Sequence, residues 1–142
     1  NFVTGVSGMV LSVDMQRGNP SDSELFIPAV QKTIDVYGKP PRQVAADGGF
    51  ASGDNLNKAK ALGVKDVAFH KRRGLSVGDM CKSNWVYKQL IRFRAGIEGN
   101  ISFLKRVFGL DRCDWKGWEG FQKYVLSAVV TYNLVKLSRL TA

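Results

Sequence analysis

The sequence predicts an α/β fold in which short strands alternate with helices and a helical part follows. Between residues 21 and 69, helical patterns alternate with short apolar runs, an order typical of parallel strands joined by crossover helices. Before them, two β-prone runs stand close enough together to form a hairpin. After residue 84, apolar residues recur at helical spacing almost to the end of the chain.

The first elements have clear limits in the sequence. Residues 2–4 and 9–13 are β-prone and are joined by a Gly-containing connection, which predicts an antiparallel hairpin. A helix should begin after Ser21, because Ser21 and Glu24 form a capping-box pattern. Gly38, with Pro40 shortly after it, should end this helix.

The next segments predict a strand, a helix and another strand. Residues 43–46 form a short apolar run that suits a strand buried on both faces. Ser52 should open a helix over residues 54–62, and Gly63 should close it. Residues 64–69 should form the next strand, and the basic, Gly-rich residues 70–83 are expected to be a loop.

The second half predicts two helices joined by a Trp- and Gly-containing connection over residues 111–120. The first helix carries an apolar stripe that should pack against the sheet, made of Val86, Leu90, Phe93, Ile97, Ile101, Leu104 and Phe108. Gly96 and Gly99 lie inside it, each at a cost of about 1 kcal/mol relative to Ala, which suggests that a backbone or a ligand approaches closely. The final helix is expected over residues 121–140.

Length and charge indicate one domain with a polyanionic partner. The 142 residues, 44% of them hydrophobic, suffice for a single core, with sheet and crossover helices over about 1–70, a basic loop over 71–83 and a helical part over 84–142. Lys and Arg number 21 against 12 Asp and Glu, which gives a net charge of +9 and a pI near 9.8. Such a balance favours nucleic acid as a partner, although a basic protein with no such partner remains the alternative.

Cysteine usage and hydropathy indicate a cytoplasmic protein. Cys81 and Cys113 form no metal-binding pattern, His70 is the one histidine, and two such thiols fit a reducing compartment. The most apolar stretch, residues 124–135, contains polar side chains and is too short to span a bilayer, so no membrane partner is expected.

Two acidic residues are candidate metal ligands. Asp47 follows the predicted strand at residues 43–46, where ligands gather in open α/β sheets, and its carboxylate suits Mg²⁺. Glu98 borders the apolar stripe, with Arg94 four residues before it and Lys105 seven after it. The plainer interpretations are an Asp-Gly turn at Asp47 and a surface ion pair between Arg94 and Glu98.

The remaining candidates are basic or aromatic. His70, Lys71, Arg72 and Arg73 form a cluster that could hold a DNA backbone or simply solubilise a loop. Trp115 and Trp118, placed in the connection, are better candidates for base stacking than Trp85, which is expected to pack in the core.

Taken together, these segments resemble the DDE transposases of bacterial insertion sequences over nearly the whole chain. Residues 18–22 resemble the family segment after the third strand, and residues 44–50 resemble the strand that carries the second catalytic Asp. Arg94, Glu98 and Lys105 match the Arg-x3-Glu-x6-Lys part of the family's Tyr-x2-Arg-x3-Glu-x6-Lys motif. Ile91 stands at the Tyr position, which leaves the role of that position open.

The resemblance implies a ribonuclease H-like mixed sheet flanked by helices, without its first strand here, and a C-terminal helical pair. It implies cleavage and strand transfer at transposon ends with two Mg²⁺ or Mn²⁺ ions, Asp47 and Glu98 serving as catalytic metal ligands. Arg94, Lys105 and the cluster at residues 70–73 would contact DNA, and the full-length protein is expected to be a nucleoid-associated homodimer or higher oligomer.

The resemblance also leaves one acid unassigned. Asp14 lies on the last strand of the opening segment, so the first catalytic Asp is expected upstream of Asn1. We therefore expect the chain alone to be inactive in DNA cleavage. The alternatives are a non-catalytic nucleic-acid-binding domain on the same scaffold and a plain metal-dependent nuclease.

Overall fold

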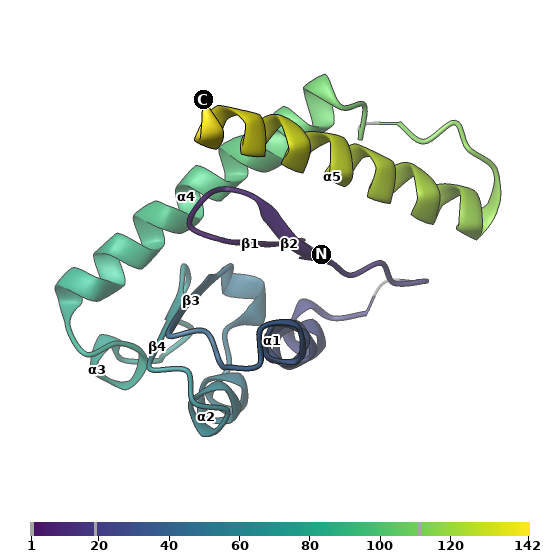
Figure 1. The fold of residues 1–142 in the computed structure, drawn as a ribbon. Coiled ribbons are helices and arrows are strands. Elements are labelled where there is room, and N and C mark those ends of the chain that lie inside the picture. The colour runs from purple at the N-terminus through teal and green to yellow at the C-terminus, as the bar shows by residue number, and fades with distance from the viewer. Residues whose placement is uncertain (1, 19, 111) are drawn as a thin grey trace. The chain divides into compact units, whose positions relative to one another are not determined.

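The computed structural model describes residues 2–18, 20–110 and 112–142, so the family-like segment at 18–22 is described except for Asn19 (Figure 1). The chain divides into two compact units, one made of Asn1–Met15 with Gly96–Ala142 and the other of Gln16–Ala95. Each unit has its own hydrophobic core. The prediction of a single domain over residues 1–142 stays a prediction.

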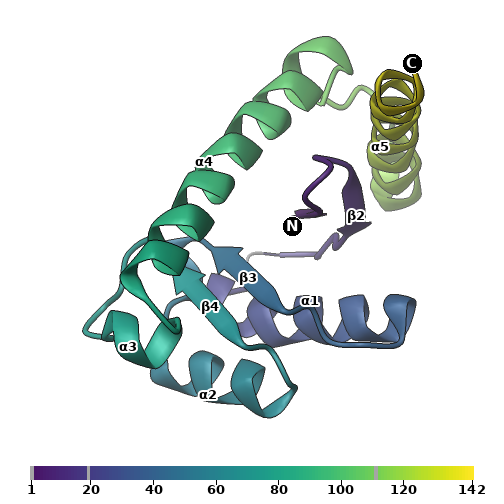
Figure 2. The same ribbon diagram turned by 60° about the vertical axis from the view of Figure 1, so that its left-hand side comes forward.

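The unit of Gln16–Ala95 is built on a parallel strand pair. Its elements are α1 (Asp22–Tyr37), β3 (Gln43–Ala46), the 3-10 helix η1 (Gly48–Phe50), α2 (Gly53–Ala61), β4 (Asp66–Phe69), α3 (Val77–Met80) and the start of α4 (Asn84–Val107). β3 pairs with β4 in parallel from Gln43↔Asp66 to Ala46↔Phe69. α1 and α2 lie side by side along the pair (Figure 1, Figure 2). The predicted parallel strands with a crossover helix are confirmed for β3, α2 and β4, whereas β2 pairs only with β1 among the described strands, so the first of the predicted crossovers, through α1, is not found.

Local signals explain most of the helix limits, with one exception. Ser21 is the N-cap of α1, but its side chain makes no cap hydrogen bond, so the predicted capping box does not form. Gly38 ends α1 in the left-handed conformation, with φ 69°, and donates its N–H to the Ile34 carbonyl. Ser52 caps α2 by accepting a hydrogen bond from the Asn55 N–H at 3.0 Å.

The two strands differ in burial. All four residues of β4 are buried, whereas β3 is exposed at Gln43 and only half-buried over the rest of its length. The prediction that residues 43–46 are buried on both faces is therefore wrong. β3 and β4 each have one paired neighbour among the described strands, so the difference in burial lies in how much of each strand's faces is covered by packed elements.

The core of this unit is centred on aromatic residues. Phe69 is fully buried and its ring lies 5.3 Å from that of Phe26, measured between centroids. α1, α2, β4, α3 and the start of α4 all contribute to the core, with Val30, Leu56, Val67, Met80, Val86 and Leu90 among its members.

The other unit packs a hairpin against the C-terminal helix. β1 (Phe2–Thr4) pairs antiparallel with β2 (Val10–Val13), as predicted, and α5 spans Gly117–Thr141. The Asn133 side chain accepts from the Val10 N–H at 2.9 Å and donates to the Val10 carbonyl at 2.8 Å. Tyr132 is fully buried and donates its hydroxyl to the Gly8 carbonyl at 2.8 Å. These side chains satisfy backbone groups at the hairpin end of β2.

The stripe on α4 divides between the two cores, so the prediction that it packs as a whole against the sheet is wrong. Val86 and Leu90 belong to the core around β4, whereas Leu104 and Phe108 pack with the hairpin and α5. Phe93 is only half-buried and belongs to neither core. At Gly96 and Gly99, apart from the chain neighbours and the nearby backbone of α4 itself, no atom of the described residues lies within 4 Å of the position that a Cβ would take, so no other backbone approaches closely there.

Three further expectations need correction. The segment 70–83 is not all loop, because it contains α3, whose N-cap Ser76 accepts from the Asp79 N–H. α5 begins at Gly117, which places Trp118 in a helix instead of the connection. Trp85 is 69% exposed and therefore does not pack in the core as expected.

The described strands form two separate two-stranded sheets, so the fold is α/β without one continuous mixed sheet in this part of the chain. No helix among the residues that the structure describes is long and apolar enough to cross a membrane.

Phe69→Ala should lower the free energy of unfolding by about 3–5 kcal/mol, because it removes a fully buried ring. Phe93→Ala is the matched control and should cost clearly less, since Phe93 is half-buried. Urea unfolding followed by circular dichroism measures both. Equal losses would contradict the placement of Phe93 outside the two cores.

Candidate active site

Asp47 lies at the carboxyl end of β3, where the chain turns into η1. Its carboxylate accepts a hydrogen bond from the Gly48 N–H at 2.6 Å, and its carbonyl accepts from the Phe50 N–H at 3.1 Å. The side chain nevertheless stays 55% exposed. The Asp-Gly turn and a carboxylate open to a ligand therefore coexist at this position.

Arg94 reaches this carboxylate from α4. Its Nη2 lies 3.3 Å from Asp47 Oδ1, and the Arg94 side chain is only 16% exposed. Two turns earlier on the same helix, the Tyr87 hydroxyl donates to the Phe69 carbonyl at 2.9 Å, at the carboxyl end of β4. Tyr87 thereby ties α4 to the end of the sheet at which Asp47 lies.

His70 and Lys71 lie beside Asp47 for reasons of register and packing. The His70 N–H donates to the Ala46 carbonyl at 3.0 Å, which extends the parallel ladder to the level of Asp47. A Cβ on Gly48 would stand 2.5 Å from the Lys71 Cβ, so only glycine leaves room for the Lys71 stem. Gly48 is therefore required where the basic segment that begins at His70 packs closely against the turn at Asp47.

Arg72 and Arg73 continue this basic loop and are exposed. The loop turns back at Arg73, which has a φ of 46°, and at Gly74, with φ 88°. The Leu75 N–H closes the turn by donating to the Arg72 carbonyl at 2.9 Å. The structure thus brings Asp47, Arg94, His70 and Lys71 together and places Arg72 and Arg73 in the adjoining turn.

Asp22 is a neighbour that the sequence analysis did not single out as a site residue. Its carboxylate packs against the Cα of Gly49, where a Cβ would collide with Asp22 Oδ2. In the sequence, Gly49 indicates that another residue approaches the backbone closely at this position, but it does not indicate that this residue is Asp22.

Glu98 and Lys105 belong to the other unit, and both are exposed. Lys105 lines a largely apolar cavity of about 220 Å³ together with Ile101, Leu104 and Tyr124. Asp14 directly follows β2 and therefore does not lie on the strand, contrary to the expectation. A shared ion between Asp47 and Glu98 stays a prediction.

The chemistry of these donors suits a hard divalent cation only in part. Carboxylate oxygens are the ligands that Mg²⁺ and Mn²⁺ prefer, and Asp47 presents one that is exposed to solvent. Within residues 2–18, 20–110 and 112–142, however, no group of three or more His, Cys, Asp or Glu side chains is placed to hold a metal.

The opposite end of the strand pair holds a structural polar cluster. Asp66 is buried and accepts from the Lys82 N–H at 2.8 Å and from Gln43 Nε2 at 2.9 Å. Burial alone would raise the pKa of Asp66, but these hydrogen bonds and the charges of Lys60 and Lys82 hold it below its ordinary value. Burial, with Asp66 nearby, raises the pKa of the Cys81 thiol to about 11, so this thiol stays neutral.

Asp66→Asn should lower the free energy of unfolding by about 1–3 kcal/mol at pH 7 and by less at about pH 3, which lies below the unfolded pKa. Because the pKa of Asp66 is lower in the folded state, its ionised form stabilises the fold above the unfolded pKa of about 3.9. This stabilisation is lost as the pH falls through the folded pKa. Urea unfolding at the two pH values measures the change, and a loss independent of pH would contradict the assignment.

Comparison with known proteins identifies the family. The family model described as the transposase DDE domain matches residues 2–134, which is nearly the whole chain. No curated protein and no solved structure gave a significant match. With an acidic turn at the carboxyl end of a parallel strand pair, and with this match, the chain belongs to the DDE-type transposase catalytic domain family.

Proposed function

We propose that this chain carries two acids of a divalent-metal site for strand cleavage and transfer on DNA. The single observation that supports this most strongly is the exposed Asp47 carboxylate with Arg94 3.3 Å away and the Lys71 stem against the adjacent Gly48. A carboxylate that can bind a cation, Asp47, lies beside two cationic residues that can bind phosphates, Arg94 and Lys71. Phosphoryl transfer on DNA requires both kinds of group.

Asp47 and Glu98 are the residues that would hold the ion. Glu98 follows Arg94 by four residues within α4, and side chains at that spacing share one face of a helix. Glu98 is the one acidic residue in the sequence of α4, so it is the residue of this helix that we propose as the second ligand. A bound Mg²⁺ or Mn²⁺ would polarise phosphate oxygens and lower the pKa of bound water. Two ions are proposed for a site completed by a third carboxylate.

The basic residues would bind and orient the DNA. Arg94, with a planar fork of donors, suits a phosphate next to the reacting bond. His70, Lys71, Arg72 and Arg73 form an exposed basic stretch next to Asp47 that would hold the backbone on either side. Lys105 is proposed as a further phosphate contact from α4. These side chains would contact phosphates and not the edges of the nucleobases, so DNA binding should show little sequence preference.

Several finer features belong to the same proposal. A ribonuclease H-like sheet would join the strands that form two separate sheets in the described residues. A homodimer or higher oligomer would bring two transposon ends together, and the protein would act at the bacterial nucleoid.

A non-catalytic DNA-binding domain is the second candidate, favoured by the lack of a three-acid group in the described part of the chain. For the same reason, we expect this chain alone to bind DNA without Mg²⁺- or Mn²⁺-dependent nicking. A plain nuclease differs from a transposase in a joining assay with pre-cleaved ends, because only the transposase would join them to a target.

The shared metal site can be tested by titrating Mn²⁺ into ¹⁵N-labelled protein. Paramagnetic broadening should appear at the amides of Gly48 and Gly49 and also at residues 97–99. Asp47→Asn and Glu98→Gln should each abolish the broadening of both segments. Asp54→Asn, which removes an exposed carboxylate paired with Lys58 on α2, is the control and should change neither. Broadening at Gly48 that survives Glu98→Gln would overturn the shared site.

A further inference from the structure

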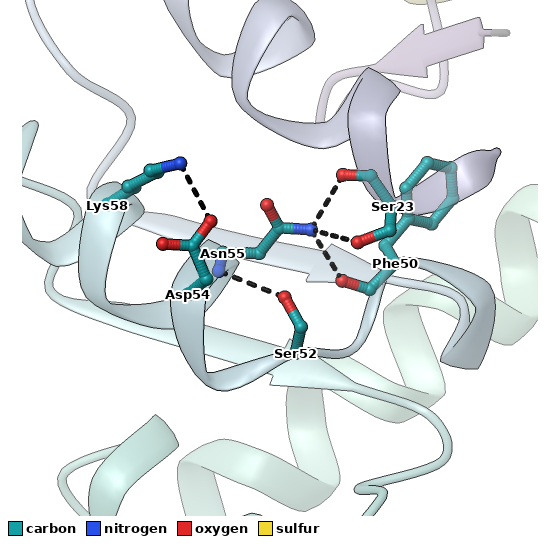
Figure 3. A network of polar contacts seen from close by, with 6 residues as sticks. All are labelled: Ser23, Phe50, Ser52, Asp54, Asn55 and Lys58. Carbon is teal, nitrogen blue, oxygen red and sulfur yellow. Dashed lines mark hydrogen bonds and ion pairs between the residues drawn. The ribbon is translucent and has the colours of Figure 1, made fainter. Parts of the chain in front are cut away.

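Asn55 is a buried polar residue in a unit whose core is otherwise almost entirely apolar. It lies in the first turn of α2 and is 5% exposed. Its Nδ2 donates to the Ser23 carbonyl at 2.8 Å, to Ser23 Oγ at 3.2 Å and to the Phe50 carbonyl at 2.9 Å (Figure 3). A buried amide is costly unless it is hydrogen-bonded, so this arrangement is specific.

The side chain joins three segments that are separate in the sequence. Ser23 lies in the first turn of α1, Phe50 ends η1, and Asn55 itself belongs to α2 (Figure 3). Nothing in the periodicity of these segments requires a link among them. Asn55 therefore links the end of η1 to the start of α1.

The turn that carries Asp47 is held from both of its ends by these contacts. At the start, the Asp47 carboxylate accepts from the Gly48 N–H, and the Asp47 carbonyl accepts from the Phe50 N–H. At the end, the Phe50 carbonyl accepts from Asn55. η1 is closed by hydrogen bonds from the Phe50 N–H to the Asp47 carbonyl and from the Ala51 N–H to the Gly48 carbonyl, so a shift of Phe50 would also move Asp47.

The link to Ser23 adds a second restraint on the same turn. Ser23 is next to Asp22, whose carboxylate packs against the Cα of Gly49. If Asn55 no longer forms its hydrogen bonds to Ser23, the start of α1 would be free to move. The Asp22 carboxylate would then lose its contact with the Gly49 backbone. Both restraints act on the residues that follow Asp47 directly.

We propose that Asn55 is a positioning residue for the Asp47 carboxylate, acting through the Phe50 carbonyl and the start of α1. This inference rests on the proposed function in one respect, because it takes a divalent ion as the ligand of Asp47. It assigns to Asn55 no contact with metal or DNA.

The variant Asn55→Leu tests the proposal, because leucine keeps nearly the same shape and removes the donor. Asn55→Ser serves as a milder variant in case leucine prevents folding. The matched control is Ser52→Ala, which removes the α2 cap at the Asn55 N–H but leaves the three side-chain hydrogen bonds of Asn55 intact. All variants are compared at a temperature at which circular dichroism shows them folded.

Two measurements separate a positioning role from a merely stabilising one. Hydrogen exchange at the Phe50 and Ala51 amides, which close η1, should become at least tenfold faster in Asn55→Leu relative to the β4 amides. The apparent Kd for Mn²⁺, taken from the broadening at Gly48, should rise at least tenfold. Ser52→Ala should change both by less than threefold.

The outcomes decide between the alternatives. Wild-type Mn²⁺ affinity in a folded Asn55→Leu or Asn55→Ser variant overturns the proposal, whether or not exchange is faster, since Asn55 would then only stabilise the fold. Equal effects of Ser52→Ala would overturn it too, because the helix cap would suffice to explain them. If the wild type binds no Mn²⁺, the proposed function falls, and the exchange comparison alone decides whether Asn55 holds the turn.

Discussion

An Arg94→Gln variant should bind Mn²⁺ about tenfold more tightly than the wild type and should bind duplex DNA more weakly. The guanidinium lies 3.3 Å from Asp47 Oδ1 and therefore competes with a metal ion for this oxygen. Removing a unit charge beside a dication changes affinity by about 1 kcal/mol or more, which is close to a tenfold change, with solvent screening at the half-exposed Asp47 limiting the effect. Isothermal titration calorimetry measures the Mn²⁺ affinity directly.

Two further variants control this experiment. Arg94→Lys keeps the charge and should leave the Mn²⁺ affinity near that of the wild type. Arg92→Gln removes an exposed charge from the same helix two residues away and should have little effect. Weaker Mn²⁺ binding in Arg94→Gln would contradict competition and would show that Arg94 holds Asp47 in the orientation that binds the ion.

Replacing Lys71, Arg72 and Arg73 together with Ala should reduce the salt dependence of DNA binding. Each lost phosphate contact lowers the slope of log K against log salt by about 0.9, so three contacts lower it by about 2.7. These residues are exposed in a turn that packs its first side chain against Gly48, beside Asp47. Fluorescence anisotropy with a labelled duplex, measured at salt concentrations from about 50 to about 200 mM, gives the slope.

A second triple variant carries the same loss of charge elsewhere on this unit. Lys39, Lys58 and Lys65 are exposed, and Lys65 directly precedes β4 at the end of the strand opposite His70. Changing these three to Ala should leave the slope nearly unchanged. An equal decrease in the slope of log K against log salt for both triple variants would mean that net charge, and not the basic loop, governs DNA binding.

The local elements could be predicted because their signals are local. The hairpin, the parallel pair with its crossover helix, and the end of α1 at Gly38 follow from short-range patterns and caps. α3 escaped prediction because a four-residue helix is too short to show apolar periodicity. Its cap was visible as Ser76 followed three residues later by Asp79, a pattern that the basic composition of the segment obscured.

Burial was predicted less well, because it depends on neighbours that are distant in the sequence. The α4 stripe correctly indicated an amphipathic helix, but it could not show that Leu90 and Leu104 join different cores. β3 has the apolar sequence of a buried strand and is half-buried, since burial depends on what covers each face and edge.

By itself, the sequence determined the family, the strand that leads to Asp47 and the helix that carries Arg94 and Glu98. Spacing and composition suffice for these because they reflect backbone propensity and periodicity within a few residues. Only the tertiary structure decided that Arg94 pairs with Asp47, that Lys71 passes over Gly48, and that Asn55 ties η1 to α1. Such contacts join residues whose separation along the chain carries no pattern, so packing alone brings them within hydrogen-bonding distance.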